Sequence, residues 1–424
     1  MKLSRNAGPQ PALCLFLLTL MILASVGCGT ASSANKGTTT TPTNSPTNSP
    51  PAASAPQNTF SYVNNPKSNN VFGFSANNQT SSVSAISGSP FAVPTYPADV
   101  ATSGSFIFVE STGVNALNPA EYVLTSYKVD ATTGALTSSS TLNVGSMFGG
   151  DYPSNIAVDP AGKYLYMSVI GPSPNPPIGV FSIDPNTGSL SEVTTSEFTS
   201  AQPFAGYRMV VSPNEKFLFV AAAVGTASTG TPPPQGVQPI TRDPNTGILS
   251  STLVPLTIPK SSVGSSNIEA MAVTPSNNFL LGTAVSLNQV FVWSIEPNTG
   301  ALTQVSVFGD PQATMMIAPR GIAVDPTGKF AIVAGSDSNN LSVFSISSSG
   351  TLTPVAGSPF PAGSGTTSVA INASGNLVFV GNVGSNDMSV FQFDSNTGAL
   401  TPVQGSPFPI GESAFNLMTV VTIH

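Results

Sequence analysis

Short apolar segments separated by turn residues follow one another along most of this chain. Around residue 330 the pattern reads GIAVDP, FAIVAG, NLSVFSI and TLTPVAGSPF, at residues 321–326, 330–335, 340–346 and 351–360. Segments of this length, rich in β-branched and aromatic residues and bounded by Gly, Pro and Asn, predict β-strands. The second segment of each group is apolar at nearly every position, which predicts a strand that is covered on both faces.

These four segments recur as a unit, and a DPNTG-like turn marks each copy. The last residues of the successive turns are Ser81, Gly134, Gly188, Gly247, Gly300, Gly350 and Gly398. The spacings between these turn ends are 53, 54, 59, 53, 50 and 48 residues. A period of this size is typical of solenoids and propellers, and four strands in each period indicate blades stacked around an axis.

The two ends of the repeat region decide the number of blades. TFSYVNN at residues 59–65 matches the second strand of a blade, whereas NLMTVVTI at 416–423 matches a first strand with nothing after it. The last strand would complete the blade begun at Thr59, which closes the ring and removes a sheet edge. We therefore expect an all-β fold over residues 59–424, a seven-bladed β-propeller of four-stranded antiparallel blades closed by the C-terminal strand.

Composition excludes most classes of enzyme site. The chain has one histidine, His424, at its last position, which excludes a Ser-His-Asp triad, a Cys-His pair or a His-ligated zinc site within the fold. Charged residues make up 7% of the chain and the net charge is −7, so there is no basic surface for nucleic acid. The acidic turn residues lack calcium-loop spacing and suit the turns themselves. We expect neither a metal nor a cofactor.

The first residues read as an export signal. Lys2 and Arg5 precede an apolar run at 11–25, and Gly27 and Cys28 follow, as in a secretory signal. The placement of Cys28 resembles the bacterial lipoprotein signal, although Ser25 stands where Leu is usual. Lipidation of Cys28 would make the chain an extracytoplasmic, membrane-anchored protein of the cell envelope; plain secretion is the alternative. We expect the protein to be a monomer. Residues 29–58 contain no aromatic or large aliphatic residue, which predicts a disordered tether after a 1–28 signal.

One family resemblance covers residues 59–424. VFQFDSNTGALTPVQGSPF at 390–408 resembles the seven-bladed lactonase family, which includes propeller-type 6-phosphogluconolactonases and fungal carboxymuconate lactonising enzymes. YVN at 62–64 is also similar to the YVTN repeats of microbial surface-layer propellers. These motifs belong to the strands and turns of the scaffold, so they are specific for the fold and weak for chemistry. The resemblance implies a hydrolase that opens a small, sugar-type lactone.

Candidate chemistry gathers on the rim opposite the repeated turns. Three long loops, at 110–121, 170–179 and 224–236, would form a wall on one side of it, and function is often carried by such loops. Polar and aromatic residues stand just before the first strands of the blades, namely Tyr96, Asp99, Asp151, Tyr152, Tyr207, Arg208, Glu269 and Arg320.

Two functions remain open for this rim. As a lactonase, the chain would use Arg208 or Arg320 to hold an anionic group and Glu269 to activate water. Tyr96, Asp151, Tyr152 and Tyr207 would then bind the sugar-like ring. Alternatively, Glu269 and Arg320 form a structural ion pair and the tyrosines fill the channel. The protein would then be a non-catalytic surface propeller that binds a protein or glycan through its long loops.

Overall fold

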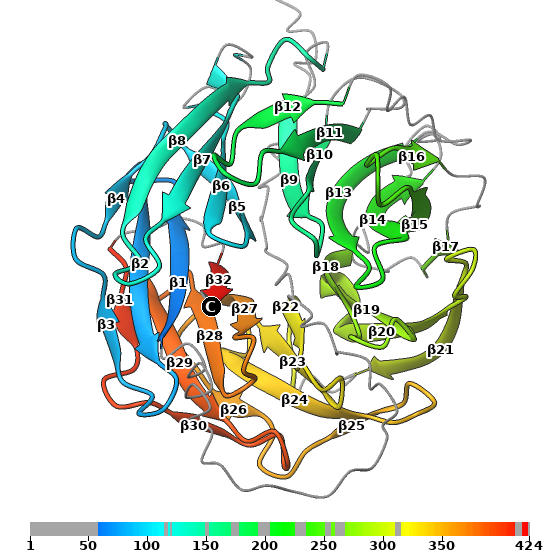
Figure 1. Ribbon diagram of the computed structural model, residues 1–424. Coiled ribbons are helices and arrows are strands. Elements are labelled where there is room, and N and C mark those ends of the chain that lie inside the picture. Colours follow the sequence, from blue (N-terminus) through cyan, green and yellow to red (C-terminus); the bar gives the residue numbers. More distant parts are fainter. Residues whose placement is uncertain are drawn as a thin grey trace, which may run out of the picture.

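The computed structural model describes residues 58–113, 118, 121–148, 152–170, 178–193, 204–224, 235–250, 256–258, 268–309, 315–411 and 418–422. Seven antiparallel sheets stand around a central axis (Figure 1). The expected signal with Cys28, the tether, Asp151 and most of the three long loops lie outside the described residues. Among the residues that are described, no helix is long and apolar enough to cross a membrane.

Each blade runs from an inner strand to an outer one. The inner strands are β5 (Pro97–Ser103), β9 (Tyr152–Val158), β13 (Phe204–Val211), β18 (Ile268–Val273), β22 (Pro319–Val324), β27 (Thr366–Ile371) and β32 (Met418–Thr422). The second strands are β1 (Asn58–Asn65), β6 (Phe106–Ser111), β10 (Tyr164–Ile170), β14 (Phe217–Val224), β19 (Phe279–Ala284), β23 (Phe330–Gly335) and β28 (Leu377–Asn382).

The outer half of each blade is built from a long third strand and a fourth strand of variable length. The third strands are β2 (Asn70–Asn77), β7 (Val123–Val129), β11 (Ile178–Ile183), β15 (Gln235–Arg242), β20 (Gln289–Ile295), β24 (Asn340–Ile346) and β29 (Asp387–Phe393). The fourth strands are β3 (Val83–Ala85), β8 (Leu136–Asn143), β12 (Leu190–Glu192), β16 (Leu249–Ser250), β21 (Leu302–Gly309), β25 (Leu352–Pro354) and β30 (Leu400–Pro402). Short additional strands pair with four of the third strands; these are β4 (Phe91–Ala92), β17 (Leu256–Thr257), β26 (Phe360–Pro361) and β31 (Phe408–Pro409).

The predicted closure of the ring is confirmed. Strand β32 pairs antiparallel with β1, in a register that runs from Thr59 opposite Thr422 to Val63 opposite Met418. The first blade is therefore assembled from both ends of the propeller, and the fold is the all-β, seven-bladed one expected from the repeats. The second strands β6, β23 and β28 are buried at every position, as their apolar sequences predict.

The glycine that ends each repeated turn also makes contact between blades. Gly300 has a φ of +77°, and a Cβ atom on it would lie 2.6 Å from the ring of Phe217 on the preceding blade. The same close approach of glycine to ring occurs at Gly134 and Phe60, Gly188 and Phe106, Gly247 and Tyr164, Gly350 and Phe279, and Gly398 and Phe330. At the remaining repeat position the turn ends in Ser81 and the neighbouring blade carries Leu377, a smaller side chain. Backbone conformation and room for a ring together explain why the turn is repeated.

Replacing Gly300 with Ala is expected to destabilise the propeller by more than about 1–2 kcal/mol, the cost of the left-handed backbone alone. The excess comes from the contact with Phe217. Gly104 is a matched control, because its φ is +52° and a Cβ there would meet nothing within 4 Å. Denaturant unfolding of both variants separates the two contributions, and equal losses of stability would show that the contact between blades adds nothing.

The acidic residues of the repeated turns are engaged by their own backbone. One carboxylate oxygen of Asp184 accepts hydrogen bonds from the N–H groups of Asn186 and Thr187, both at 2.8 Å. Such bonds, chiefly that from Thr187, lower the pKa of Asp184. These turns therefore use their acidic side chains structurally, as predicted from the sequence.

Candidate functional site

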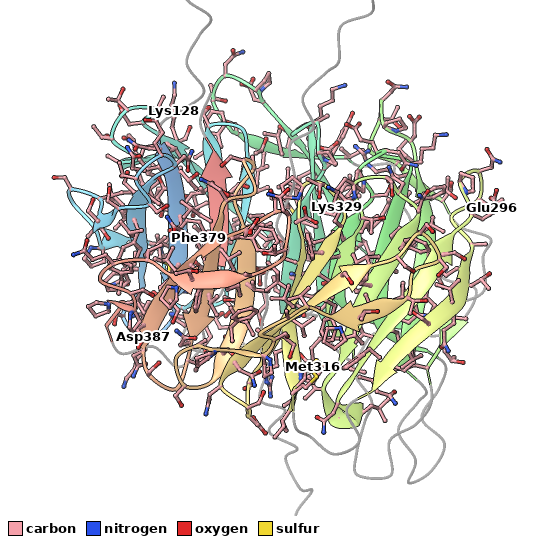
Figure 2. The ribbon with its side chains drawn as sticks, turned by 90° about the horizontal axis from the view of Figure 1, so that it is seen from below. Lys128, Glu296, Met316, Lys329, Phe379 and Asp387 are labelled. Carbon is pink, nitrogen blue, oxygen red and sulfur yellow. The ribbon has the colours of Figure 1, made fainter. Side chains whose placement is uncertain are left out.

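The two rims of the ring are built from different kinds of connection. Figure 2 shows Lys128, Lys329 and Glu296 on the rim of the repeated turns, with Met316 and Asp387 on the opposite rim. Met316 precedes β22 and Asp387 begins β29. The inner strands therefore start at this second rim, which we call the mouth.

An asparagine clasp joins neighbouring blades at the mouth. In three blades whose second and third strands are joined by a short turn, a left-handed Asn accepts a hydrogen bond from the residue before the next inner strand. These bonds run from the N–H of Tyr96 to Asn69 (2.8 Å), of Ala318 to Asn288 (2.9 Å) and of Gly365 to Asn339 (2.7 Å). In three further blades the chain between the second and third strands is longer, and most of it lies outside the described residues.

Tyr96 is strained at its place in the clasp. Its φ is +58°, a conformation that is costly for a bulky residue, and the equivalent residues Ala318 and Gly365 are small. Its side chain is 37% exposed. Backbone strain and an exposed aromatic ring at one position are typical of a functional site.

Six of the seven inner strands carry a β-bulge at their mouth ends. The residues displaced from the ladder, which we call the bulge ring, are Ala98, Ser154, Tyr207, Glu269, Arg320 and Thr367. A bulge changes the direction of a side chain and is over-represented next to active sites. The predicted equivalence of Glu269 and Arg320 is thus a shared bulge position on neighbouring blades.

Glu269 and Arg320 influence each other without forming an ion pair in the described part of the chain. Burial raises the pKa of Glu269, and the charges of Arg208 and Arg320 partly offset this. Both bulge residues are half-buried. The Nη1 atom of Arg320 is buried and has no hydrogen-bond partner among the described residues. A buried, unsatisfied donor of this kind is rare, so its position calls for a ligand or water partner.

Two serine hydroxyls at the mouth are, like the Nη1 atom of Arg320, buried without a described hydrogen-bond partner. The Oγ atoms of Ser154, on the bulge of β9, and Ser368, just after the bulge of β27, are buried without a hydrogen-bond partner in the ranges described. Together with Arg320, they give the mouth three polar atoms from three blades whose hydrogen-bonding capacity is unused. Such an arrangement suits a polar ligand.

Arg208 lies deeper and is tied to the scaffold. Its side chain is only 3% exposed, and its Nε donates a 3.1 Å hydrogen bond to the backbone carbonyl of Glu269. Its charge acts on Glu269, Asp99 and Glu110. Of the two arginines predicted to hold an anionic group, Arg320 is the one with an unused donor, whereas Arg208 braces the strand that carries Glu269.

A relay of hydrogen bonds connects the inner strands behind the mouth. The Oδ2 atom of Asp99 accepts from Asn155 Nδ2 at 2.6 Å and from the N–H of Ile156 at 2.9 Å. The Oδ1 atom of Asn155 accepts from the N–H of Met209 at 2.9 Å. With the bond from Arg208 to Glu269, the relay spans four successive blades. Burial raises the pKa of Asp99 to about 7, although these donors and Arg208 act in the opposite direction.

The prediction that Glu110 begins a long loop is wrong. Glu110 belongs to β6 and lies directly opposite Asp99 in the strand register. Its side chain is fully buried. The apolar run before it gave no signal for a buried acid, because a charged residue at the end of such a run reads as the start of a loop. The other two loops are likewise shorter than predicted, since Ile170, Gly179, Val224 and Gly236 all lie in strands.

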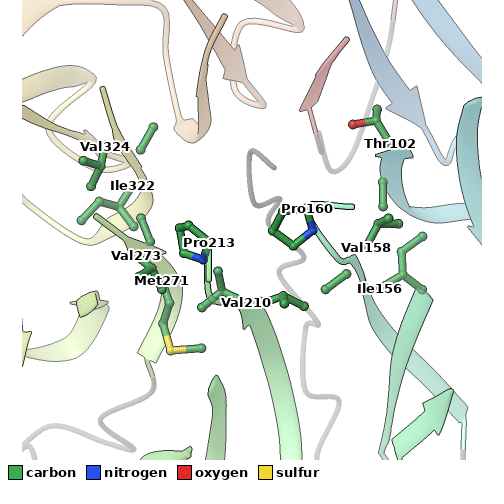
Figure 3. Close-up of a pocket in the computed structure, with 15 residues that line it drawn as sticks. Thr102, Ile156, Val158, Pro160, Val210, Pro213, Met271, Val273, Ile322 and Val324 are labelled. Carbon is green, nitrogen blue, oxygen red and sulfur yellow. The ribbon is translucent and has the colours of Figure 1, made fainter. Parts of the chain in front are cut away.

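Below the mouth the channel is apolar. A cavity of about 60 Å³ lies between β5, β9, β13, β18 and β22, and Figure 3 shows Ile156, Val210, Met271 and Ile322 around it. These residues stand one or two positions further along their strands than the polar residues Asn155, Arg208, Glu269 and Arg320. A polar ligand would therefore be bound at the mouth and not deeper in the channel.

Some predicted site residues remain untested. Asp151 lies outside the described residues, and Tyr152 and Tyr207 are described in their backbone alone, within β9 and β13. The predicted binding of a sugar-like ring by Asp151, Tyr152 and Tyr207 stays a prediction.

Comparison with solved structures finds the same architecture. A candidate 6-phosphogluconolactonase from Bacteroides fragilis is 16% identical, with a TM-score of 0.68 over 87% of this chain and 99% of that chain. A second, from Bacteroides uniformis, is 18% identical, with a TM-score of 0.67 over 85% and 99%. The periplasmic gluconolactonase PpgL of Pseudomonas aeruginosa is 19% identical, with a TM-score of 0.65 over 85% and 99%. At these identities the likeness establishes the fold.

Sequence comparison identifies the family. No curated protein matches the chain. The family model for the seven-bladed β-propeller lactonases matches residues 52–196, 121–227 and 235–369. These segments cover most of the propeller, in agreement with the resemblance seen in its strands and turns. The chain belongs to the seven-bladed β-propeller lactonase family.

Proposed function

We propose that this chain hydrolyses a small lactone at the mouth, with Glu269 as the general base and Arg320 as the group that binds the carbonyl or an anionic substituent. The observation that supports this most strongly is the buried Nη1 of Arg320, which has no hydrogen-bond partner among the described residues and stands on the blade next to the bulge that carries Glu269. Family membership supports the reaction class. A sugar-type lactone suits the polar mouth above an apolar floor.

The reaction needs one base and one electrophilic site. Glu269 takes a proton from water as the water oxygen attacks the carbonyl carbon of the lactone. Arg320 stabilises the negative charge that develops on the carbonyl oxygen. The ring C–O bond then breaks, and the proton on Glu269 passes to the leaving oxygen, which gives an open-chain hydroxy acid. A Glu pKa raised by burial brings this base closer to neutral pH, so turnover is expected to fall as pH decreases through that pKa.

The second candidate is binding without hydrolysis. Tyr96 favours it, because an exposed aromatic ring on a strained backbone can stack on a sugar without any chemistry. In that case the mouth would be a glycan-binding surface of a cell-envelope propeller.

A panel of lactones separates the two functions. Purified propeller, residues 58–424, would be tested with D-glucono-1,5-lactone, its 6-phosphate and an uncharged γ-lactone, and ring opening followed by acid release. Hydrolysis above the spontaneous rate supports the lactonase function. Binding of gluconolactone or a glycan, measured by calorimetry without hydrolysis, supports the second candidate. The absence of both hydrolysis and binding would contradict both functions.

We also propose that the propeller is anchored to the cell envelope by a lipid on Cys28, because small residues and an apolar run precede it. Replacing Cys28 with Ser is expected to move the protein from the detergent phase to the aqueous phase on detergent partitioning. A wild-type protein found in the aqueous phase would contradict the anchor.

A further inference from the structure

Glu110 is the most unusual side chain in the described part of the molecule. It is fully buried, and neither of its carboxyl oxygens has a hydrogen-bond partner among the described residues. An ionised carboxylate in such a place is very costly, because nothing replaces the water that it has lost. A neutral carboxylic acid costs far less.

Two charged groups act on Glu110. Asp99 lies opposite it on β5 and repels its charged form, whereas Arg208 on β13 attracts it. The single positive charge of Arg208 does not neutralise Glu110, because it also interacts with the charges of Asp99 and Glu269. Three carboxyl groups and two guanidinium groups form this cluster, namely Asp99, Glu110, Glu269, Arg208 and Arg320. The cluster is therefore neutral when one carboxyl group holds a proton.

Hydrogen bonds distinguish the two acids that face each other, Asp99 and Glu110, whereas Glu269 has the charges of Arg208 and Arg320 beside it. Asp99 accepts three, from the N–H of Val100 at 2.7 Å and from Asn155 and Ile156. Glu110 accepts none in the part of the chain described here. Donors stabilise the charged form of an acid, and their absence favours the protonated form.

We propose that Glu110 is a buried carboxylic acid that keeps its proton at neutral pH and so holds in place the relay from Asp99 to Arg208 behind the mouth. With Glu110 neutral, the charge of Arg208 remains available to Asp99 and Glu269. With Glu110 ionised, its repulsion of Asp99 would weaken the bonds through Asn155 that position β13. Glu110 is therefore a positioning residue, and this role does not depend on whether the mouth binds a lactone.

The proton makes stability depend on pH in a defined direction. Burial and Asp99 raise the pKa of Glu110 well above its ordinary value of 4.5. Between that value and the raised one, the folded chain keeps a proton that the unfolded chain releases, so stability falls as pH rises. Glu110→Gln removes this contribution while keeping a neutral side chain of the same shape.

Two measurements on the full propeller test the proposal. Infrared spectra at pH 8 should show the carbonyl band of a buried carboxylic acid in the wild type. The same band should be present in Glu269→Gln and in the surface control Glu192→Gln. In Glu110→Gln the part of this band that belongs to Glu110 should be lost. As pH rises from 5 to 8, the denaturant midpoint of the wild type should decrease more than that of Glu110→Gln. The mouth reaction is measured in neither experiment, so their outcome is independent of the proposed lactonase activity.

Other results would overturn the proposal. No carboxylic acid band in the wild type, or a band that Glu110→Gln leaves unchanged, would mean that Glu110 is ionised. So would a Glu110→Gln variant whose midpoint shows the same dependence on pH as the wild type. If Glu110→Gln does not fold, Glu110→Met provides the second neutral replacement, and failure of both at pH 6 would also overturn it.

Discussion

Deletion of residues 416–424 is expected to abolish soluble, folded protein. Strand β32 supplies the inner strand of the first blade, and its removal leaves one side of β1 from Thr59 to Val63 without a ladder partner. These five positions of β1 are buried, so their freed N–H and C=O groups would be costly inside the ring. The bare strand edge would also be available to pair with other chains.

Soluble yield and denaturant unfolding measure this effect. Deletion of residues 423 and 424 alone is the control, because it removes chain beyond β32 and should leave stability unchanged. A truncated protein as soluble and stable as the intact chain would contradict closure of the ring by its last strand.

Replacement of Arg242 with Met is expected to cost about 3–5 kcal/mol, as does removal of one partner from other buried ion pairs. Arg242 and Asp159 are in contact, and both side chains are fully buried. The guanidinium also bonds the hydroxyl of Tyr166 and, at 2.6 Å, the carbonyl of Glu215. Without it, Asp159 keeps a buried charge, and among the described residues its remaining donors are the N–H groups of Lys163 and Tyr164.

A double variant tests the cause of that loss. If Arg242→Met destabilises because Asp159 is left charged, adding Asp159→Asn should recover part of the stability, and the two effects should not add. Unfolding free energies of the two single variants and the double variant give the coupling. A loss below about 1 kcal/mol for Arg242→Met, the value of an exposed pair, would contradict this account.

The fold was predictable because its signals are local. Strand alternation, apolar second strands and the turns that end at Gly188 or Gly300 are each visible within a few residues, and the period of the turns sets the blade count. Closure followed from the strand types at the two ends. The reason that the turns end in glycine was only partly visible, since the ring of Phe217 approaches Gly300 from another blade.

The arrangement of the site was less predictable, because it depends on relations between strands. The sequence placed Glu269 and Arg320 at equivalent positions. A bulge, however, is defined by the pairing of two strands, so it cannot be recognised in the sequence of one strand. The depth of Arg208 and the opposition of Asp99 and Glu110 likewise depend on register. Arg242 received no role from the sequence, although it holds a fully buried ion pair.

The proposed function requires that Glu269 and Arg320 form a working site and not a structural pair. The most direct measurement is hydrolysis of the best lactone together with denaturant unfolding, for wild type, Glu269→Gln and Arg320→Met. We predict that both variants lose at least about a hundred-fold in kcat/KM, as expected for loss of a general base or an oxyanion-binding group, and keep nearly full stability. Variants that retain turnover would contradict the proposed function. So would variants whose free energy of unfolding falls by about 3–5 kcal/mol, as for a broken buried pair, and which lose turnover only because they unfold.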